Sequence, residues 1–189
     1  MSVPNREAAA PILPLFLERW SPRSFTDEAL SRDALLQMLE AARWAPSANN
    51  AQPWRFAYAL RGDAAWDALR SIPNERNQVW STKAAALVLV LSDTASRYAA
   101  FDAGCAWGYL ALQAAHQGWA AHAMAGIDAD KARQVLNVPE SLSVLAMVAI
   151  GRRGPADQLP EGFREREAPS TRRPLAESIV HGAFPPAGA

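Results

Sequence analysis

Two short runs of apolar residues constrain the fold of this chain more than any other feature. Ala86–Leu91 reads A-L-V-L-V-L, and Ser143–Ile150 is a second run, which ends at Gly151. Neither run alternates between polar and apolar residues, as a strand with one solvated face would. Both are therefore predicted to be strands that are buried on both faces.

Helices and further strands are predicted around these two runs. Apolar residues at helical spacing, with caps and prolines at the ends, predict helices over 11–20, 31–45, 63–72, 96–117 and 128–137. Alternation predicts strands over 54–60 and 119–124. The stretch 72–83 is polar and irregular and is predicted to be a loop. Because helices and strands are mixed along the chain, the fold class is α+β or α/β.

The last part of the chain differs from the rest in composition. From Pro155 onward it is rich in Pro, Arg and Glu, and its apolar residues are widely spaced: Phe163, Leu175, Ile179 and Phe184. Such a tail buries little by itself, so it is either disordered or wraps a surface, and the spaced apolar residues favour wrapping around a partner subunit. No repeat or linker divides the chain, so 1–189 is predicted to be a single domain with 155–189 as its extended tail.

The charge balance argues against a nucleic-acid partner. The chain has 19 Lys and Arg against 19 Asp and Glu, whereas proteins that bind nucleic-acid phosphates usually carry a basic excess. Lys83 and Lys131 are the only lysines, so every other cation is an arginine. Arginine matches phosphate and carboxylate geometry better than lysine does. Most of the arginines are expected to be solvated, and a few to bind an anion.

Metal sites, disulfides and membrane spans are not expected either. Cys105 is the only cysteine, and the three histidines form no ligand motif: His116, His122 and His181. No apolar run approaches the ~18 residues of a transmembrane helix, and the first residues lack the order of a signal peptide. A soluble cytoplasmic protein without membrane contact is therefore predicted.

Three polar segments are candidates for a binding site. R-W-S-P-R-S-F, starting at Arg19, places two arginines and a hydroxyl within five residues at a helix end, which suits one phosphate. P-S-A-N-N-A-Q-P, starting at Pro46, holds amides between two prolines and suits the edge of a planar heterocycle. Arg172 and Arg173 could reach the phosphate from the tail. Taken singly, the two arginine segments are more simply explained as solvated arginines, and P-S-A-N-N-A-Q-P fits an ordinary turn as well as a binding loop.

Together these segments resemble the nitroreductase family of FMN-dependent oxidoreductases that use NAD(P)H. The resemblance covers nearly the whole chain in order, through R-W-S-P-R-S-F, A-P-S-A-N-N-A-Q-P-W-R-F, F-D-A-G-C-A-W-G-Y-L-A-L-Q-A-A, G-W-A-A-H-A-M-A-G-I-D and R-E-R-E-A-P-S-T-R-R-P-L. It implies an α+β fold with a mixed sheet flanked by helices. It also implies an intertwined homodimer with FMN sites at the subunit interface, where Gly104 and Gly108 let the central helices pack closely.

The resemblance also implies which residues bind the cofactor. The FMN phosphate would be held by the first motif and the tail: Arg19, Trp20, Ser21, Arg23, and Arg172 or Arg173. The isoalloxazine would be lined from the partner subunit by Pro46, Ser47 and Ala48, with Asn50 and Gln52 at or behind the ring edge. Lys83 would lie near flavin N1 and O2 and favour the reduced form. The backbone N–H groups of Ala125 and Gly126 would face N5 and O4.

No catalytic side chain and no metal is then required, because the flavin carries the hydride. The predicted activity is a ping-pong transfer from NAD(P)H to a small electron-poor acceptor such as a nitroaromatic or a quinone. A flavin-binding or flavin-consuming protein without NAD(P)H-driven reduction is the alternative, and a structural protein with solvated arginines is a third.

Several positions depart from the family pattern and leave the acceptor open. Trp20 stands where a basic or polar residue is usual, and Ala125 where larger members have glutamate. Arg152 and Arg153 replace a common aromatic. Among the other residues, Trp80 is predicted to be a pocket candidate because it lies in the supposed loop.

Overall fold

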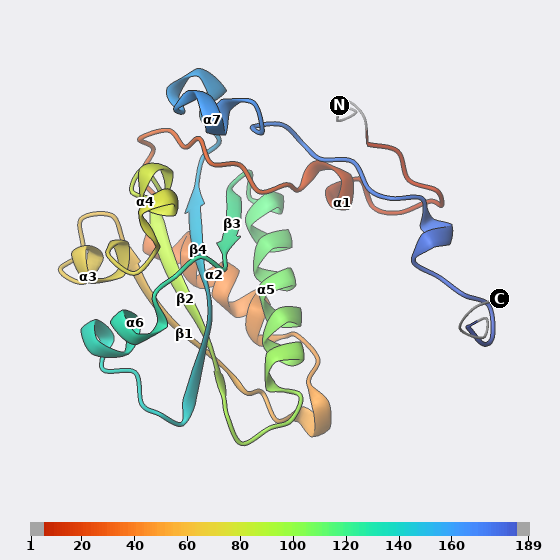
Figure 1. Ribbon diagram of the computed structural model, residues 1–189, viewed down its shortest axis with the longest axis horizontal. Helices are drawn as coiled ribbons and strands as arrows, with labels where there is room; N and C mark the ends of the chain where they lie inside the picture. The colour runs from red at the N-terminus through yellow and green to blue at the C-terminus, as the bar shows by residue number, and fades with distance from the viewer. Residues whose placement is uncertain (1–5, 185–189) are drawn as a thin grey trace.

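The computed structural model describes residues 6–184, which are built around a four-stranded sheet (Figure 1). The strands lie in the order β1-β2-β4-β3, with bounds β1 Trp54–Leu60, β2 Ala86–Asp93, β3 Ala120–Met124 and β4 Leu142–Gly151. The two apolar runs form the central pair, with Val88 opposite Val148. β2 is buried except at its last residue, and β4 is buried over its second half. Burial is therefore confirmed for β2 and for the second half of β4, whereas the first half of β4 is only partly buried.

The sheet differs from the prediction in one respect. A mixed sheet was expected, but every neighbouring pair in the described chain is antiparallel. β3 does run in the same direction as β2, yet β4 lies between them, so the two never pair. The α+β class is confirmed, with this correction to the strand directions.

Helices cover both faces of the sheet. Successive side chains of β2 point to opposite faces, and because they are apolar on both, each face is packed against helices. Val88 and Val90 pack with α2 (Arg32–Arg43) and α5 (Ala99–His116). Leu87 and Leu89 pack on the other side, in a second cluster that includes residues of α3 (Trp66–Arg70), α4 (Glu75–Ser81) and α6 (Ala129–Leu136). The result is a three-layer arrangement with a core on each side of the sheet (Figure 1). None of the helices within residues 6–184 has the length and apolar character that a membrane span requires.

Some helix ends follow from local chemistry. The Ser31 hydroxyl accepts a hydrogen bond from the Ala34 N–H at the start of α2, and the Asp128 carboxylate accepts one from the Lys131 N–H at the start of α6. Gly118, with φ of 76°, follows α5 and permits the left-handed turn into β3. The helices predicted here are confirmed, although α1 (Pro14–Glu18), α3 and α5 are shorter than predicted.

The loop predicted over 72–83 is wrong, because it contains α4. Asn74 caps this helix by accepting a hydrogen bond from the Asn77 N–H, and Glu75 lies in its first turn. Trp80 is only 1% exposed and packs in the core beside Phe25. The helix was missed because its polar residues outnumber its apolar ones, but the asparagine cap was a visible signal.

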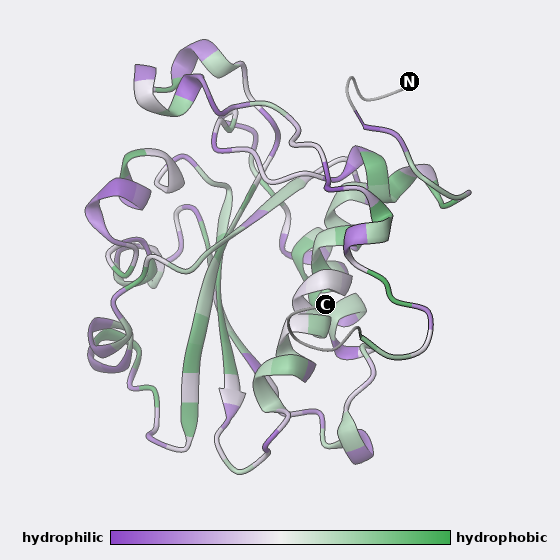
Figure 2. Cartoon of the chain, turned by 45° about the vertical axis from the view of Figure 1, so that its right-hand side comes forward, coloured by the Kyte–Doolittle hydropathy of each residue, from purple (hydrophilic) through white to green (hydrophobic). Residues whose placement is uncertain are grey.

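The tail and the N-terminal arm run side by side away from the sheet (Figure 1). The tail includes a short helix, α7 (Glu161–Arg164), and Phe163 packs against the core. Beyond it, apolar side chains are exposed, among them Leu175 and Ile179. In Figure 2, where hydrophobic residues are green, parts of α1 and of the tail are green although they lie outside the sheet and the helices that cover it. The last five residues of the predicted tail lie outside the described part.

Candidate flavin-phosphate and ring-edge site

A pocket of about 270 Å³ collects arginines from both ends of the chain. Four of the predicted residues follow α1, namely Arg19, Trp20, Ser21 and Arg23, and the fifth, Arg172, comes from the tail. Arg173 does not line the pocket. Sequence reasoning missed two further arginines, Arg6 and Arg166, which also line it. We call this the arginine pocket.

The arginine pocket has a surplus of positive charge. Burial lowers the pKa of Arg19, and the nearby charges of Arg6 and Arg172 lower it further. Burial also lowers the pKa of Arg6, again with a contribution from Arg172. Lowered pKa values mean that these guanidinium groups are destabilised as cations, mainly by burial and further by one another. A bound dianion such as a phosphate would relieve this repulsion and accept their hydrogen bonds, so the residues present fit the FMN phosphate.

One carboxylate ties the tail to the loop after α1. Glu167 is 2% exposed at its side chain, and its Oε1 accepts hydrogen bonds from the backbone N–H groups of Arg23 at 2.7 Å and Ser24 at 2.8 Å. Its other oxygen lies 3.9 Å from the Arg23 guanidinium. The tail is therefore anchored beside the arginine pocket.

A histidine forms part of the same wall. His122 stacks on Trp80 with ring centroids 4.6 Å apart, and its Nδ1 lies 2.9 Å from the Pro22 carbonyl oxygen. Because a carbonyl only accepts, this contact requires a proton on Nδ1. Burial lowers the pKa of His122 to about 4, helped by the charges of Arg23 and Arg19. The imidazole is therefore neutral near pH 7 and adds no charge to the arginine pocket.

The loop from Pro46 to Gln52, here called the 46–52 loop, is held in an unusual backbone shape. Asn49, Asn50 and Gln52 have φ of 52°, 54° and 48°, a left-handed region that asparagine tolerates better than most residues. The Ser47 hydroxyl accepts from the Gln52 N–H at 3.0 Å. Asp102, buried in α5, accepts from the Ala48 N–H at 3.2 Å. Most of the loop stays exposed, so its polar groups are available to a ligand.

The 46–52 loop does not join the arginine pocket within one chain. The loop contacts the N-terminal end of α5 at Asp102, whereas Arg19 and Ser21 line a hollow beside Ala111, further along the same helix. Nine residues of helix separate these two points by about 14 Å. The structure therefore brings together the predicted phosphate ligands but leaves the predicted ring ligands at another place.

The predicted N5 loop packs against the start of α4. The Asn74 backbone N–H and the Asn77 side-chain amide both donate to the Gly126 carbonyl at 3.0 Å. A Cβ on Gly126 would lie 2.5 Å from the Asn74 amide nitrogen and 2.8 Å from that of Asn77, so a larger residue there would displace these side chains. Asn74 and Asn77 were not predicted as site residues, although Asn74 was recognisable as a helix cap.

Lys83 lies at the other end of α4. Its side chain is exposed, and its backbone carbonyl accepts a hydrogen bond from Arg61 at 3.2 Å. It does not line the arginine pocket. The structure therefore places the asparagines, and not this lysine, beside the predicted N5 loop.

Trp20 separates the arginine pocket from a wider groove of about 830 Å³. The Arg152 guanidinium stacks over Trp119 at 4.3 Å and donates to Glu28 at 3.0 Å. Arg153 lies over Trp20 at 5.9 Å. Three of the residues that depart from the family pattern, Trp20, Arg152 and Arg153, thus form one surface, and Arg152 is already paired within it.

Comparison with known proteins places this fold in a class. The Nitroreductase family matches residues 17–152, so the chain belongs to the Nitroreductase family. It is similar to a crystal structure described as an oxidoreductase containing FMN, with 41% identity and a TM-score of 0.93 over 98% of this chain and 99% of the other.

Two further relatives cover most of their own length. A protein of Desulfovibrio desulfuricans, solved in complex with FMN, is 30% identical with a TM-score of 0.74 over 94% of this chain and 100% of the other. An NADH dehydrogenase of Thermus thermophilus is 29% identical over 92% of this chain and 98% of its own length. The resemblance derived from the motifs is thereby confirmed.

Proposed function

We propose that this protein is an FMN-dependent oxidoreductase that uses NAD(P)H to reduce a small electron-poor acceptor. The observation that carries the proposal is the arginine pocket, where Arg19, Ser21, Arg23 and Arg172 surround a space suited to one phosphate. Two relatives in the family are described with FMN. One is named an NADH dehydrogenase, which supports a nicotinamide donor.

Different residues bind the phosphate and the ring of the cofactor. The phosphate is held in the arginine pocket, with Trp20 at its margin and Arg173 next along the tail. Ala125 and Gly126 offer backbone N–H groups to the ring, supported by Asn74 and Asn77. The family position of Lys83 near N1 and O2 stays a prediction, to be tested against Asn77. The redox chemistry, which is hydride acceptance from NAD(P)H and delivery of two electrons to the acceptor, is what bound FMN supplies.

We further propose a homodimer in which the partner completes the ring site. Phe101 is 79% exposed on α5, and a Cβ on Gly104 or Gly108 of the same helix would meet no atom within 4 Å. An open apolar helix face of this kind is typical of an interface. Association through it would bring Pro46, Ser47 and Ala48 of one subunit, with Asn50 and Gln52, to the flavin of the other.

The tail would complete this arrangement by wrapping the partner. Its exposed apolar residues, Leu175, Ile179 and Val180, have no core to join in their own chain. Burying them on a second subunit would remove apolar surface from water at both partners. The chain 1–189 would then be one domain whose tail, 155–189, belongs to the neighbour's surface, in a dimer that works in the cytoplasm.

Anaerobic titration with NADH and NADPH tests the proposed function. The purified protein should be yellow, or become so with added FMN, and its flavin absorbance should bleach with either donor. Reoxidation by nitroaromatics and quinones would then identify the acceptor class. A protein that cannot be loaded with FMN contradicts the proposal. One that binds FMN but is not bleached is a flavin-binding protein without this turnover.

A further inference from the structure

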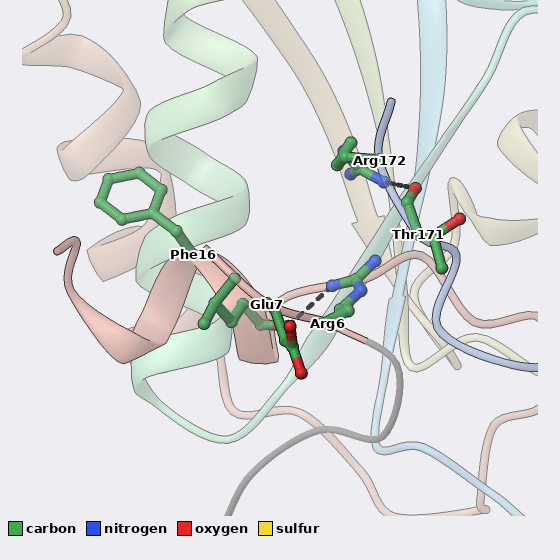
Figure 3. Close-up of a pocket in the computed structure, with 6 residues that line it drawn as sticks. Arg6, Glu7, Phe16, Thr171 and Arg172 are labelled. Atoms are coloured by element: carbon green, nitrogen blue, oxygen red, sulfur yellow. Dashed lines mark hydrogen bonds between the residues drawn. The ribbon is translucent and has the colours of Figure 1, made fainter. Parts of the chain in front are cut away.

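One arginine of the N-terminal arm joins three separate segments at the edge of the arginine pocket. Arg6 donates from Nε to the Ser170 carbonyl and from Nη1 to the Leu17 and Arg19 carbonyls, each at 2.8 Å. Figure 3 shows its side chain between the segment that carries Phe16 and the tail that carries Arg172. We call this set of contacts the Arg6 strap. Arg6 and Ser170 lie outside the span that matches the family, whereas Leu17 and Arg19 lie at its start.

The strap uses properties that are particular to arginine. Leu17 and Arg19 lie at the end of α1, where helix carbonyls have no partner within the helix. A guanidinium presents five N–H donors in a rigid plane and can serve several such carbonyls at once. A lysine ammonium carries the same charge as a compact point and cannot span the same three acceptors.

The strap is the tie between the tail and the loop after α1 that lies nearest to Arg172. The Ser24 hydroxyl donates to the Pro155 carbonyl at the start of the tail, and Glu167 accepts from Arg23 and Ser24. Ser170 is tied through Arg6, and Arg172 follows two residues later. The Arg172 guanidinium also donates to the Ser170 hydroxyl at 3.2 Å. Without Arg6, the tail would keep its Glu167 tie but lose the one next to Arg172.

We propose that Arg6 is a positioning residue for the cofactor phosphate, because it straps the tail to the loop after α1 and so directs Arg172 and Arg19 at one anion. This inference rests on the proposed FMN function. Repulsion among the three arginines opposes the strap when no anion is bound. Phosphate binding and closure of the strap therefore support each other, and the cofactor is retained longer.

Cofactor affinity in matched variants tests the strap. Arg6→Lys keeps the positive charge but lacks the planar set of N–H donors of a guanidinium. Arg6→Gln keeps amide N–H donors but lacks the charge. Arg32→Gln removes an exposed positive charge elsewhere and serves as the control. The apoprotein of each full-length variant is titrated with FMN and with riboflavin, which lacks the phosphate. Thermal melts and light scattering show whether folding and association are retained.

Both Arg6 variants should raise the Kd for FMN by about tenfold, with faster release, and leave riboflavin affinity unchanged. Arg32→Gln should change neither. The strap is refuted if Arg6→Lys binds FMN like the wild type, since charge alone would then suffice, or if riboflavin affinity falls equally. A wild-type protein that binds no FMN would overturn the proposed function together with the strap.

Discussion

The arginine pocket and the 46–52 loop are held in place in different ways. The pocket joins segments up to 164 residues apart, through the contacts of Arg6 and Glu167. The 46–52 loop is ordered locally, by its own serine and by Asp102 at the start of α5. One chain therefore builds the phosphate half of the proposed site by itself, whereas the ring half is presented to a partner. The two halves should respond differently to mutation.

The largest difference between the effects on FMN affinity and on riboflavin affinity is expected when arginines that face the phosphate are replaced. Arg19→Ala combined with Arg172→Ala removes two charged donors, at about 2 kcal/mol each, which together weaken FMN binding roughly a thousandfold. Riboflavin affinity should stay within about threefold, because the ring half is untouched. Calorimetric titration of both ligands gives the ratio. The exposed pair Arg32→Ala and Arg70→Ala is the control, and an equal loss for riboflavin would remove the distinction between the halves.

Acid should destabilise the pocket half through His122. Burial, with the charges of Arg23 and Arg19, lowers its pKa from 6.5 to about 4 in the folded protein. In the unfolded chain, His122 therefore takes up a proton as the pH falls below 6.5. In the folded protein, it takes up this proton only near pH 4. The stability that neutral His122 gives the folded protein is fully present above pH 6.5. As the pH falls toward 4, the free energy of unfolding decreases by about 3 kcal/mol through this group.

Urea unfolding of the wild type and His122→Gln between pH 7 and pH 4 measures this contribution. Glutamine keeps a donor for the Pro22 carbonyl but does not titrate. The variant should therefore lose less stability over this range than the wild type, although the carboxylates that both proteins share still contribute. Parallel curves would show that His122 is not the group responsible.

A smaller effect, with the opposite ligand pattern, is expected in the ring half. Asp102→Ala leaves the Ala48 N–H without its acceptor, at a cost of about 1–3 kcal/mol, and releases the left-handed loop. FMN and riboflavin should then weaken together, by about tenfold, because both share the ring. Asp102→Asn keeps an acceptor oxygen and should recover most of the affinity. Loss of FMN affinity alone would mean that the loop does not serve the ring.

The same contrast explains what the sequence could predict. R-W-S-P-R-S-F was recognisable because its arginines and serine are neighbours in the chain, and the pocket confirms that they converge. Arg6 belongs to no local pattern, and Arg166 lies in the R-E-R-E segment without being predicted to line the site; only the folded arm and tail bring the two to the same place. α4 was missed because apolar periodicity is weak over 75–81, although its cap at Asn74 was visible. The apolar runs predicted which strands are buried but not the directions in which they pair, because β2 and β4 are joined by contacts between residues that are distant in the chain.

The smallest effect is expected at Lys83, where the family pattern and the geometry point to different residues. An exposed charge interacts weakly through water, so Lys83→Met should change FMN affinity by less than about twofold. Asn77→Ala removes the amide that holds the Gly126 carbonyl, so it should weaken FMN and riboflavin alike by severalfold and shift the flavin potential. Potentiometric titration of both variants decides between them. A large fall in potential for Lys83→Met, with Asn77→Ala unchanged, would assign the ring contact to the lysine and show that association moves it toward the flavin.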